Sequence, residues 1–558
     1  MSTAYQQYLE FSQGGIRRGL RGLYLIRGWR PVLLPTLAVP FLGLFRGHVV
    51  AAAAVPLLAA YLGWTWYVYA IARRYLMPFQ AVSATLATVT FPAFVQYALV
   101  FNTEIFWLFT SFASLYHVFM ADRFRRRMHA CLAGVFLGLS VMIRPAETTI
   151  IMALPFGYLL ADAWRIGAVD RKEFALGLTV LGTIGAMLVA STFVTELSRI
   201  VLLGGGGIVL AVWLVVRRGR LHGVSLFCGT LSALSLGWWA GFMPALYSWV
   251  YTTSFGEMAQ KTNDHRMEGV AETLWRAFQI YLGEQFGIFV CVAVIGLAAT
   301  AFERRSRTMD LWKTDEAVRY PPSELGLLAM AMVMPIATLY ALSGTSDPRR
   351  PIVGMAVTML CVAILSVRGH SYSRIRTFVV LCVVAVNAFG LLNAAQIGIT
   401  LPARMVSDFR LYLPPARLKA DENPYLIDAL TNLGVTRNDG VAVYTLALFQ
   451  SSARIYEPAA LELAALIKGQ PARIVYLWDD GDYTRVLAVL YRQDNHYLLL
   501  DLYDGPGARD THYPYVEFTT ALLDRLAGGA DPPPGLERVG TIHLGGRDHV
   551  LFRILPPN

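Results

Sequence analysis

Two short turns beside apolar segments carry residues that could act on a phosphorylated substrate. The turn F-N-T-E places Glu104 directly before the apolar run 105–121, and the turn M-I-R-P-A-E places Arg144 directly before Pro145. A guanidinium beside a helix that begins at proline can hold a phosphate. A carboxylate at a membrane boundary is costly unless it faces a cavity or a partner. The pattern predicts an anion site, but Glu104 could also serve its own helix dipole and Arg144 could simply pair with Glu104 or Glu147.

Two other connections between apolar runs, on the same predicted side of the membrane as these turns, carry residues that could contact a substrate. Residues 252–274 form the longest of these connections and hold the densest polar cluster, with three candidate substrate-binding residues: Lys261, His265 and Arg266. The turn T-S-D-P-R-R-P at 345–351 holds Arg349 and Arg350 between two prolines. A bound anion would explain two adjacent arginines on a side with few cations, so we predict a donor phosphate there.

Apolar runs of roughly membrane-crossing length position these turns. A helix needs about 17–25 apolar residues to cross a bilayer, and a chain that is 55% hydrophobic and 15% charged has more apolar surface than one soluble core would bury. Twelve spans are predicted at 50–72, 79–100, 105–121, 129–143, 148–164, 174–193, 197–216, 224–251, 275–302, 325–343, 351–367 and 377–397. The lipid bilayer is therefore an expected partner.

The cations fix an expected orientation. Alternate loops hold twenty Lys and Arg residues, and the intervening loops hold seven. The positive-inside rule places the first set in the cytoplasm, so Glu104, Arg144 and the C-terminal tail face outward. The basic residues lie at span ends, not on one continuous face, so no nucleic-acid partner is expected despite the net charge of +10.

The two ends of the chain are predicted to lie outside the helical membrane domain. Residues 1–49 are interpreted as an extracytoplasmic or interfacial segment, in which 31–45 is short, contains three prolines and is favoured as re-entrant over a thirteenth span. Residues 398–558 are interpreted as a soluble extracytoplasmic α/β domain with a parallel sheet. Strand patterns at 441–445, 473–478, 497–503, 538–542 and 549–554 alternate there with helical patterns at 424–433, 457–468, 482–493 and 514–528. No metal-ligand spacing and no cofactor motif is found, and the five cysteines all fall within spans.

The runs F-N-T-E-I-F-W-L-F and R-F-R-R-R-M-H-A-C-L-A-G-V-F-L-G-L-S-V-M-I-R-P-A-E resemble a known family. They are similar to the C-type (GT-C) glycosyltransferases of the protein O-mannosyltransferase and aminoarabinose transferase superfamily, of the bacterial type. R-G-W-R-P-V-L-L-P-T-L-A-V-P-F-L at 27–42 resembles the segment before that family's second membrane helix. Similarity is clearest over 5–160.

The resemblance implies a polytopic α-helical enzyme of about 12–13 transmembrane helices in a bacterial inner membrane. It would move a sugar from a polyprenyl-phosphate donor to an extracytoplasmic glycan, lipid or protein, with inversion. In the family one acidic residue in the first outer loop acts as base and a second assists. Glu104 matches the second acid and Arg144, Arg349 and Arg350 match the cations. The first acid has no direct counterpart, and Glu10 is the only acidic residue before Glu104.

Two other classes remain open from the residues. A transporter or flippase of a lipid-linked or anionic substrate would show inverted repeats and mid-membrane charges, and no clear repeat is found. A non-catalytic membrane scaffold would agree with the missing first acid.

Overall fold

The computed structural model describes the helices and strands on which the argument depends. It describes residues 2–25, 33–91, 94–95, 103–165, 167, 171–191, 205–217, 223–239, 287–296, 298, 352–367, 373–394, 423–436, 439–444, 458–469, 473–476, 496–501, 535–544 and 547–555. The chain divides into two compact units. The first comprises Met1–Ile26, Leu42–Val49 and Pro414–Asn558, and the second comprises Arg27–Phe41 and Val50–Leu413.

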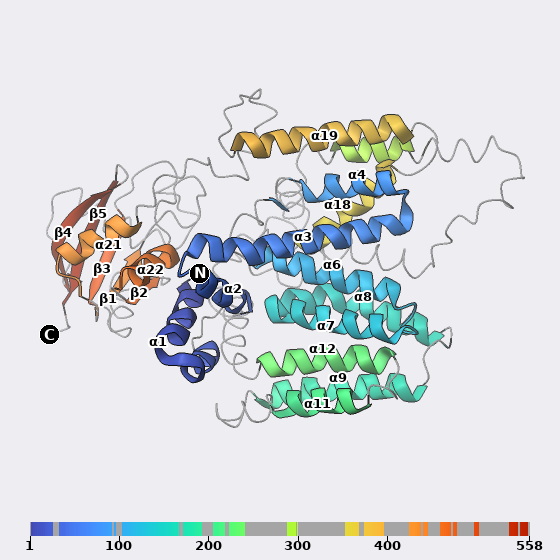
Figure 1. The fold of residues 1–558 in the computed structure, drawn as a ribbon, viewed down its shortest axis with the longest axis horizontal. Helices are drawn as coiled ribbons and strands as arrows, with labels where there is room; N and C mark the ends of the chain where they lie inside the picture. The colour runs from blue at the N-terminus through green and yellow to red at the C-terminus, as the bar shows by residue number, and fades with distance from the viewer. Residues whose placement is uncertain are drawn as a thin grey trace, which may run out of the picture. The chain divides into compact units, whose positions relative to one another are not determined.

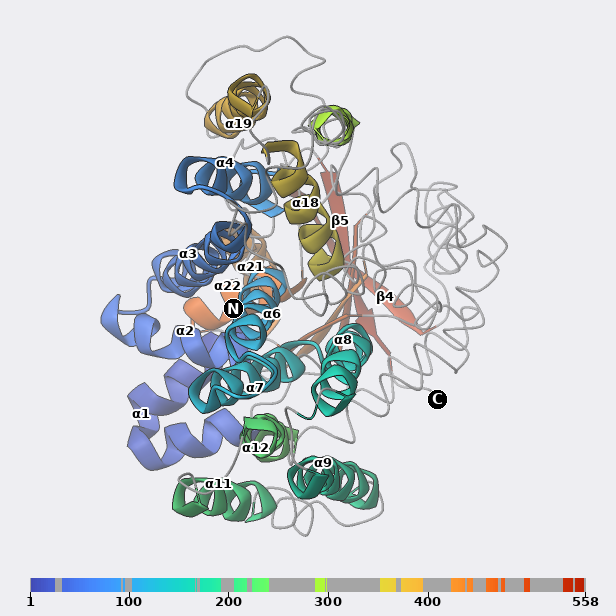
Figure 2. The ribbon, with the colours of Figure 1, turned by 90° about the vertical axis from the view of Figure 1, so that its right-hand side faces the viewer.

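In its described residues the second unit consists of helices and the turns that join them (Figure 1). Its helices are α3 (Val49–Tyr75), α4 (Pro78–Val89), α6 (Glu104–Met120), α7 (Arg127–Ile143), α8 (Pro145–Arg165), α9 (Arg171–Ser191), α11 (Gly205–Arg217), α12 (Gly223–Trp239), α18 (Ile352–Val367) and α19 (Ser373–Ala394), after α2 (Leu33–Leu44). Each predicted span contains helix wherever the structure describes it, and the 325–343 span lies outside the described residues. Figure 2 shows many of these helices nearly end-on.

The lengths of the described helices only partly match the predicted spans. Within the described residues, Ala51–Tyr75 is the one helix long and apolar enough to cross a membrane by itself. The helix at the start of the predicted span 79–100 ends at Val89, since the non-helical Phe91 precedes Pro92 and a residue before proline disfavours helix. Helix α2 has 12 residues, and a rise of about 1.5 Å per residue makes it too short to span.

Small residues and aromatic rings hold the helices that surround Arg144 and Glu104. Gly134 and Gly138 on α7 form a G-x-x-x-G pair facing α12, where a Cβ at Gly134 would lie 2.2 Å from Thr230 Oγ1. Such small residues let two membrane helices approach closely. On α3 the fully buried Trp64 contacts the rings of Phe94 and Phe112 edge-on at 5.6 and 6.0 Å. This packing fixes α6 and α7 against rigid neighbours.

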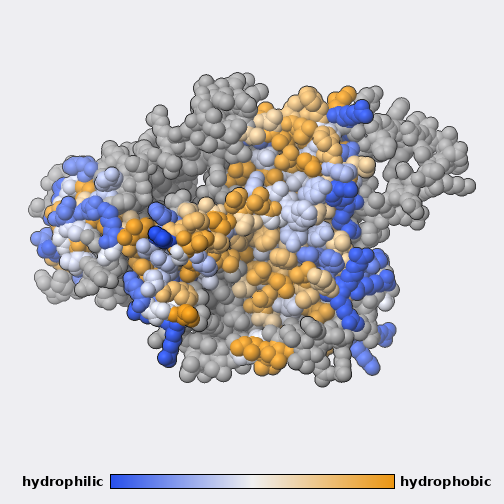
Figure 3. Space-filling view, viewed as in Figure 1, coloured by the Kyte–Doolittle hydropathy of each residue, from blue (hydrophilic) through white to orange (hydrophobic). Residues whose placement is uncertain are grey.

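Polar side chains of the helical unit gather where α6 ends and α7 begins, as the hydrophilic band in Figure 3 shows. The cations of this band include Arg73 and Arg74 in the last turn of α3 and Arg165 in the last turn of α8. Arg125 and Arg127, beside the start of α7, are exposed. The opposite end of the same helices, where α6 starts and α7 ends, carries Glu104 and Arg144.

The first unit contains a five-stranded sheet in the order β2-β1-β3-β5-β4. Its strands are β1 (Gly440–Tyr444), β2 (Arg473–Tyr476), β3 (Tyr497–Asp501), β4 (Leu536–Leu544) and β5 (Arg547–Ile554), and its helices α21 (Asn423–Asn432) and α22 (Pro458–Ile467) pack against each other. All five predicted strands are present. The helical patterns at 482–493 and 514–528 lie outside the described residues.

The prediction of a parallel sheet was wrong for two strands. β1 pairs with β2 and β3 in parallel, but β5 pairs antiparallel with both β3 and β4. In the sequence only Gly545 and Gly546 separate β4 from β5. A two-residue Gly-Gly connection is typical of a hairpin and leaves no room for the crossover that a parallel pair needs.

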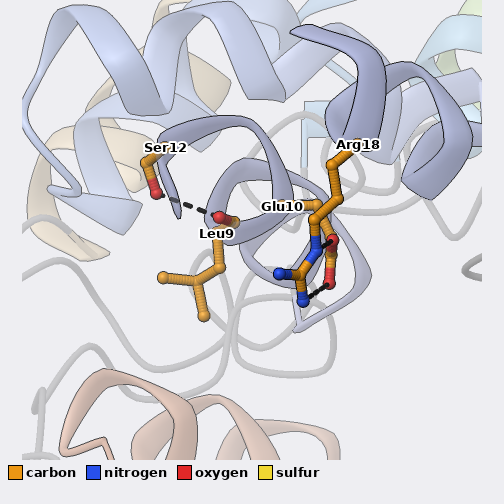
Figure 4. Close-up of polar contacts among 4 residues, drawn as sticks. All are labelled: Leu9, Glu10, Ser12 and Arg18. Atoms are coloured by element: carbon orange, nitrogen blue, oxygen red, sulfur yellow. Dashed lines mark hydrogen bonds and ion pairs between the residues drawn. The ribbon is translucent and has the colours of Figure 1, made fainter. Parts of the chain in front are cut away.

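The first unit also contains α1 (Ser2–Leu25), which bends at Gly15, where φ is 69°. A left-handed φ suits glycine because it has no Cβ. The bend brings Arg18 back onto Glu10, eight residues earlier in the chain (Figure 4). α1 packs against α22 within this unit.

Candidate functional site

Glu104 is the first residue of α6 and is fully buried. Thr103 forms the N-cap, and its carbonyl accepts the backbone N–H of Trp107 over 2.9 Å. A carboxylate in the first turn interacts favourably with the positive end of the helix dipole. This accounts for the position of Glu104 on the helix, but burial still requires a partner for its charge.

Arg144 lies between two helices. Its backbone, with φ −141° and ψ 82°, is not helical, and Pro145 begins α8. The Arg144 N–H donates to the Ser140 carbonyl, and the Arg144 carbonyl accepts the N–H of Thr148, each over 2.9 Å. Proline is favoured at a helix start because it needs no hydrogen-bond acceptor there. The break leaves the Arg144 side chain at the joint of α7 and α8.

The structure brings Glu104 and Arg144 together. Arg144 Nη2 donates to Glu104 Oε1, and the two side chains are 13% and 0% exposed. Of the two pairings that the sequence allowed for Arg144, the one with Glu104 is formed. The side chain of Glu147 is not among those that the structure describes. Breaking a buried pair by removing one charge costs about 3–5 kcal/mol because the other charge stays buried. Each residue therefore sets the position of the other.

Trp107 and Thr148 complete the surroundings of the guanidinium. The Arg144 Cζ lies 5.7 Å from the centre of the Trp107 ring, which is within range of a cation–π interaction. Trp107 Nε1 donates to Thr148 Oγ1 over 2.8 Å, and Thr148 Oγ1 donates to the Ser140 carbonyl over 3.0 Å. Trp107, Thr148 and Ser140 are all buried.

These three residues were missed by the sequence argument, although a periodic signal was available. Glu104, Trp107, Thr110, Ser111 and Ser114 recur along α6 every three or four residues and so share one face. Polar groups on one face of an apolar helix indicate a helix–helix contact.

The other predicted site residues are placed as follows. Glu10 accepts hydrogen bonds from Arg18 Nε at 2.5 Å and Nη2 at 3.4 Å, and the two side chains are 29% and 61% exposed (Figure 4). Glu10 lies in the first unit and Glu104 in the second. The remaining candidates lie outside the described residues: Lys261, His265, Arg266, Arg349 and Arg350. In the described parts of the chain, no group of three or more His, Cys, Asp or Glu side chains could hold a metal ion.

The buried pair lies within the part of the chain that matches a protein family. Residues 30–195 match the model of the dolichyl-phosphate-mannose-protein mannosyltransferase family. No curated protein matches the chain.

Solved structures give more distant likenesses. The oligosaccharyltransferase AglB from Archaeoglobus fulgidus, in complex with an inhibitory peptide and a dolichol-phosphate, has 14% identity and a TM-score of 0.44. That alignment covers 90% of this chain and 65% of AglB, so the chain spans about two thirds of its length. ArnT from Cupriavidus metallidurans, bound to undecaprenyl phosphate, has 12% identity and a TM-score of 0.43, covering 100% of this chain and 94% of ArnT.

Proposed function

We propose that this chain is a glycosyltransferase of the GT-C superfamily that transfers a sugar from a polyprenyl-phosphate donor to an acceptor outside the cytoplasm. The observation that carries the proposal is the buried pair of Glu104 and Arg144, one carboxylate and one cation at the joint of three helices. The family description supports the donor class, because dolichyl-phosphate-mannose is a polyprenyl-phosphate sugar. The acceptor is a hydroxyl-bearing glycan, lipid or protein.

The reaction exchanges one C–O bond for another at the anomeric carbon. The acceptor hydroxyl oxygen attacks that carbon, and the polyprenyl phosphate leaves with the electron pair of the broken bond. A phosphate leaves without needing a proton, so the protein must supply a base for the acceptor and positive charge for the leaving group. We assign the first task to Glu104, in place of the assisting role that the resemblance implies for it, and the second to Arg144. A single displacement inverts the anomeric centre.

The pairing of Glu104 and Arg144 is compatible with both roles. A guanidinium has five N–H donors in a planar fork, so Arg144 can bind Glu104 through Nη2 and a phosphate oxygen through another N–H. The carboxylate and the phosphate are then separated by the guanidinium and two hydrogen bonds of about 2.8 Å each. One arginine could therefore contact both the base and the leaving phosphate.

The remaining assignments follow from positions in the sequence. Arg349 and Arg350 would bind the donor phosphate with Arg144, and Lys261, His265 and Arg266 would contact the substrate. Glu10 is the second candidate for the base. The excess of cations in alternate loops supports placing Glu104, Arg144 and the domain 398–558 outside the cytoplasm of a bacterial inner membrane, with 50–397 in the bilayer and 1–49 at its surface.

The substitution Glu104→Gln tests this function. It keeps the size of the side chain and an oxygen that can accept from Arg144, but it removes the base. Transfer from a polyprenyl-phosphate sugar in proteoliposomes should fall by about 10²–10⁴-fold. Near-normal transfer by this variant would exclude Glu104 as the base and move the assignment to Glu10, for which Glu10→Gln is the matching variant.

A further inference from the structure

The indole of Trp107 is held in one orientation by a directional pair of hydrogen bonds. A threonine hydroxyl has one proton, and that of Thr148 is donated to the Ser140 carbonyl over 3.0 Å. Its oxygen therefore accepts the Trp107 Nε1–H, at 2.8 Å. The same Ser140 carbonyl accepts the backbone N–H of Arg144 over 2.9 Å. One carbonyl on α7 thus links the indole, the hydroxyl and the backbone of Arg144.

The other polar side chains on this face of α6, those of Thr110, Ser111 and Ser114, hold α6 against α7. Ser140 Oγ donates to Thr110 Oγ1 over 2.7 Å and lies 3.3 Å from Ser111 Oγ. Ser114 Oγ donates to the Ala133 carbonyl over 3.0 Å. These contacts fix α6 to α7 in register and in rotation, and turning the Trp107 ring away from Arg144 would break its buried hydrogen bond to Thr148.

We propose that Trp107 and Thr148 are positioning residues that hold the guanidinium of Arg144 ready for the donor phosphate. Arg144 has a long side chain with many rotamers, and ordering it only on binding would weaken affinity. The indole face and Glu104 together restrict it before any ligand arrives. The proposal rests on the proposed function, because it assumes that Arg144 binds the phosphate of a polyprenyl-phosphate donor.

Two substitutions remove the hydrogen bond between Trp107 and Thr148. Thr148→Val is nearly isosteric but leaves the Trp107 Nε1–H without its acceptor, and Trp107→Phe keeps an aromatic ring while removing the N–H. Thr148→Ser restores the hydroxyl. Trp64→Phe is the matched control, because Trp64 is equally buried but packs its indole against Phe94 and Phe112.

The measurement is the dissociation constant for undecaprenyl phosphate, determined on the purified full chain in nanodiscs. We expect Thr148→Val and Trp107→Phe to weaken binding by about two- to tenfold, the effect of one net hydrogen bond. Thr148→Ser and Trp64→Phe should bind like the wild type. In a transfer assay the KM for the donor should rise while the KM for the acceptor stays unchanged, which a general loss of packing would not produce.

Failure of this inference differs from failure of the proposed function. If Arg144→Ala weakens binding but folded Trp107→Phe and Thr148→Val bind like the wild type, the positioning role is wrong and the phosphate site stands. If Thr148→Val does not fold, the affinity of Trp107→Phe compared with that of its control Trp64→Phe decides whether Trp107 positions Arg144. If Arg144→Ala itself leaves undecaprenyl phosphate binding unchanged, both the site and its positioning fail.

Discussion

The opposite ends of α6, α7 and α8 carry the same kind of ion pair in different surroundings. At one end Arg144 donates to Glu104, and at the other Arg123 Nε donates to Asp162 Oδ2 over 2.9 Å. Both carboxylates are buried, with side-chain exposures of 0% and 8%. Because charge and burial are alike, neither property by itself distinguishes a reactive site from a structural one.

At the Arg123 end, further charged and aromatic side chains lie around the ion pair. Asp162 has a second arginine, Arg165, at 3.5 Å, and the ring of Phe124 lies 5.4 Å from that of Phe227. Asp122, Arg123 and Phe124 all have left-handed φ angles, of 47°, 55° and 67°. Each costs roughly 1–2 kcal/mol in a residue with a Cβ, so the ion pair and the ring contacts must offset this strain. This end fastens the α6–α7 turn to α8 and α12.

At the Arg144 end an aromatic ring lies beside the cation of the pair, and the N-terminal ends of α6 and α8 meet at the same place. An anion can interact there with a guanidinium and with the N-termini of two helices. The pair at this end is not needed to offset backbone strain, as the pair at the Arg123 end is. The comparison therefore predicts that changes at the Arg123 end lower stability alone, whereas changes at the Arg144 end also lower the donor affinity or turnover of the folded protein.

The largest expected effect is an all-or-none difference in maleimide labelling between the two predicted sides of the membrane. In a chain whose native cysteines are replaced, cysteines at Ser346 and Ser451 should react with an impermeant maleimide in intact cells. A cysteine at the exposed Arg125, near the Arg123 end, should react only after the membrane is opened. The reverse pattern would invert the orientation and place Glu104 and Arg144 on the cytoplasmic side.

Asp162→Asn is the next test, as the counterpart of Glu104→Gln at the other end. Both variants neutralise a buried carboxylate that pairs with an arginine. Asp162→Asn should destabilise the chain by about 1–3 kcal/mol, because Arg123 loses a charge-assisted hydrogen bond but is 27% exposed and stays partly solvated. The measurement is the thermal unfolding midpoint, which should fall. Donor binding and transfer by the folded protein should stay normal. A large loss of transfer with normal stability would show that the two ends do not differ as described.

The sequence predicted most elements but not the details that make the site. Apolar length located the described helices from α3 to α19, and β-rich runs located all five strands. The direction of β4 and β5 was missed because the alternation of strands and helices was given more weight than the Gly545-Gly546 connection. Glu104 and Arg144 were identified from their places beside apolar runs, yet only packing could show which glutamate Arg144 meets. Trp107 and Thr148 were missed because their roles depend on the rotation of α6 against α7 and α8.

The most direct test of the phosphate site is a titration of the purified chain with undecaprenyl phosphate. Arg144→Ala should weaken binding by roughly ten- to a hundredfold, the effect of losing one charge-assisted contact of about 1.5–3 kcal/mol. Arg123→Ala, which removes the arginine of the other pair, should bind like the wild type once it is folded. Equal affinity of Arg144→Ala and wild type, or an equal loss in both variants, would contradict the assignment of the donor phosphate to Arg144.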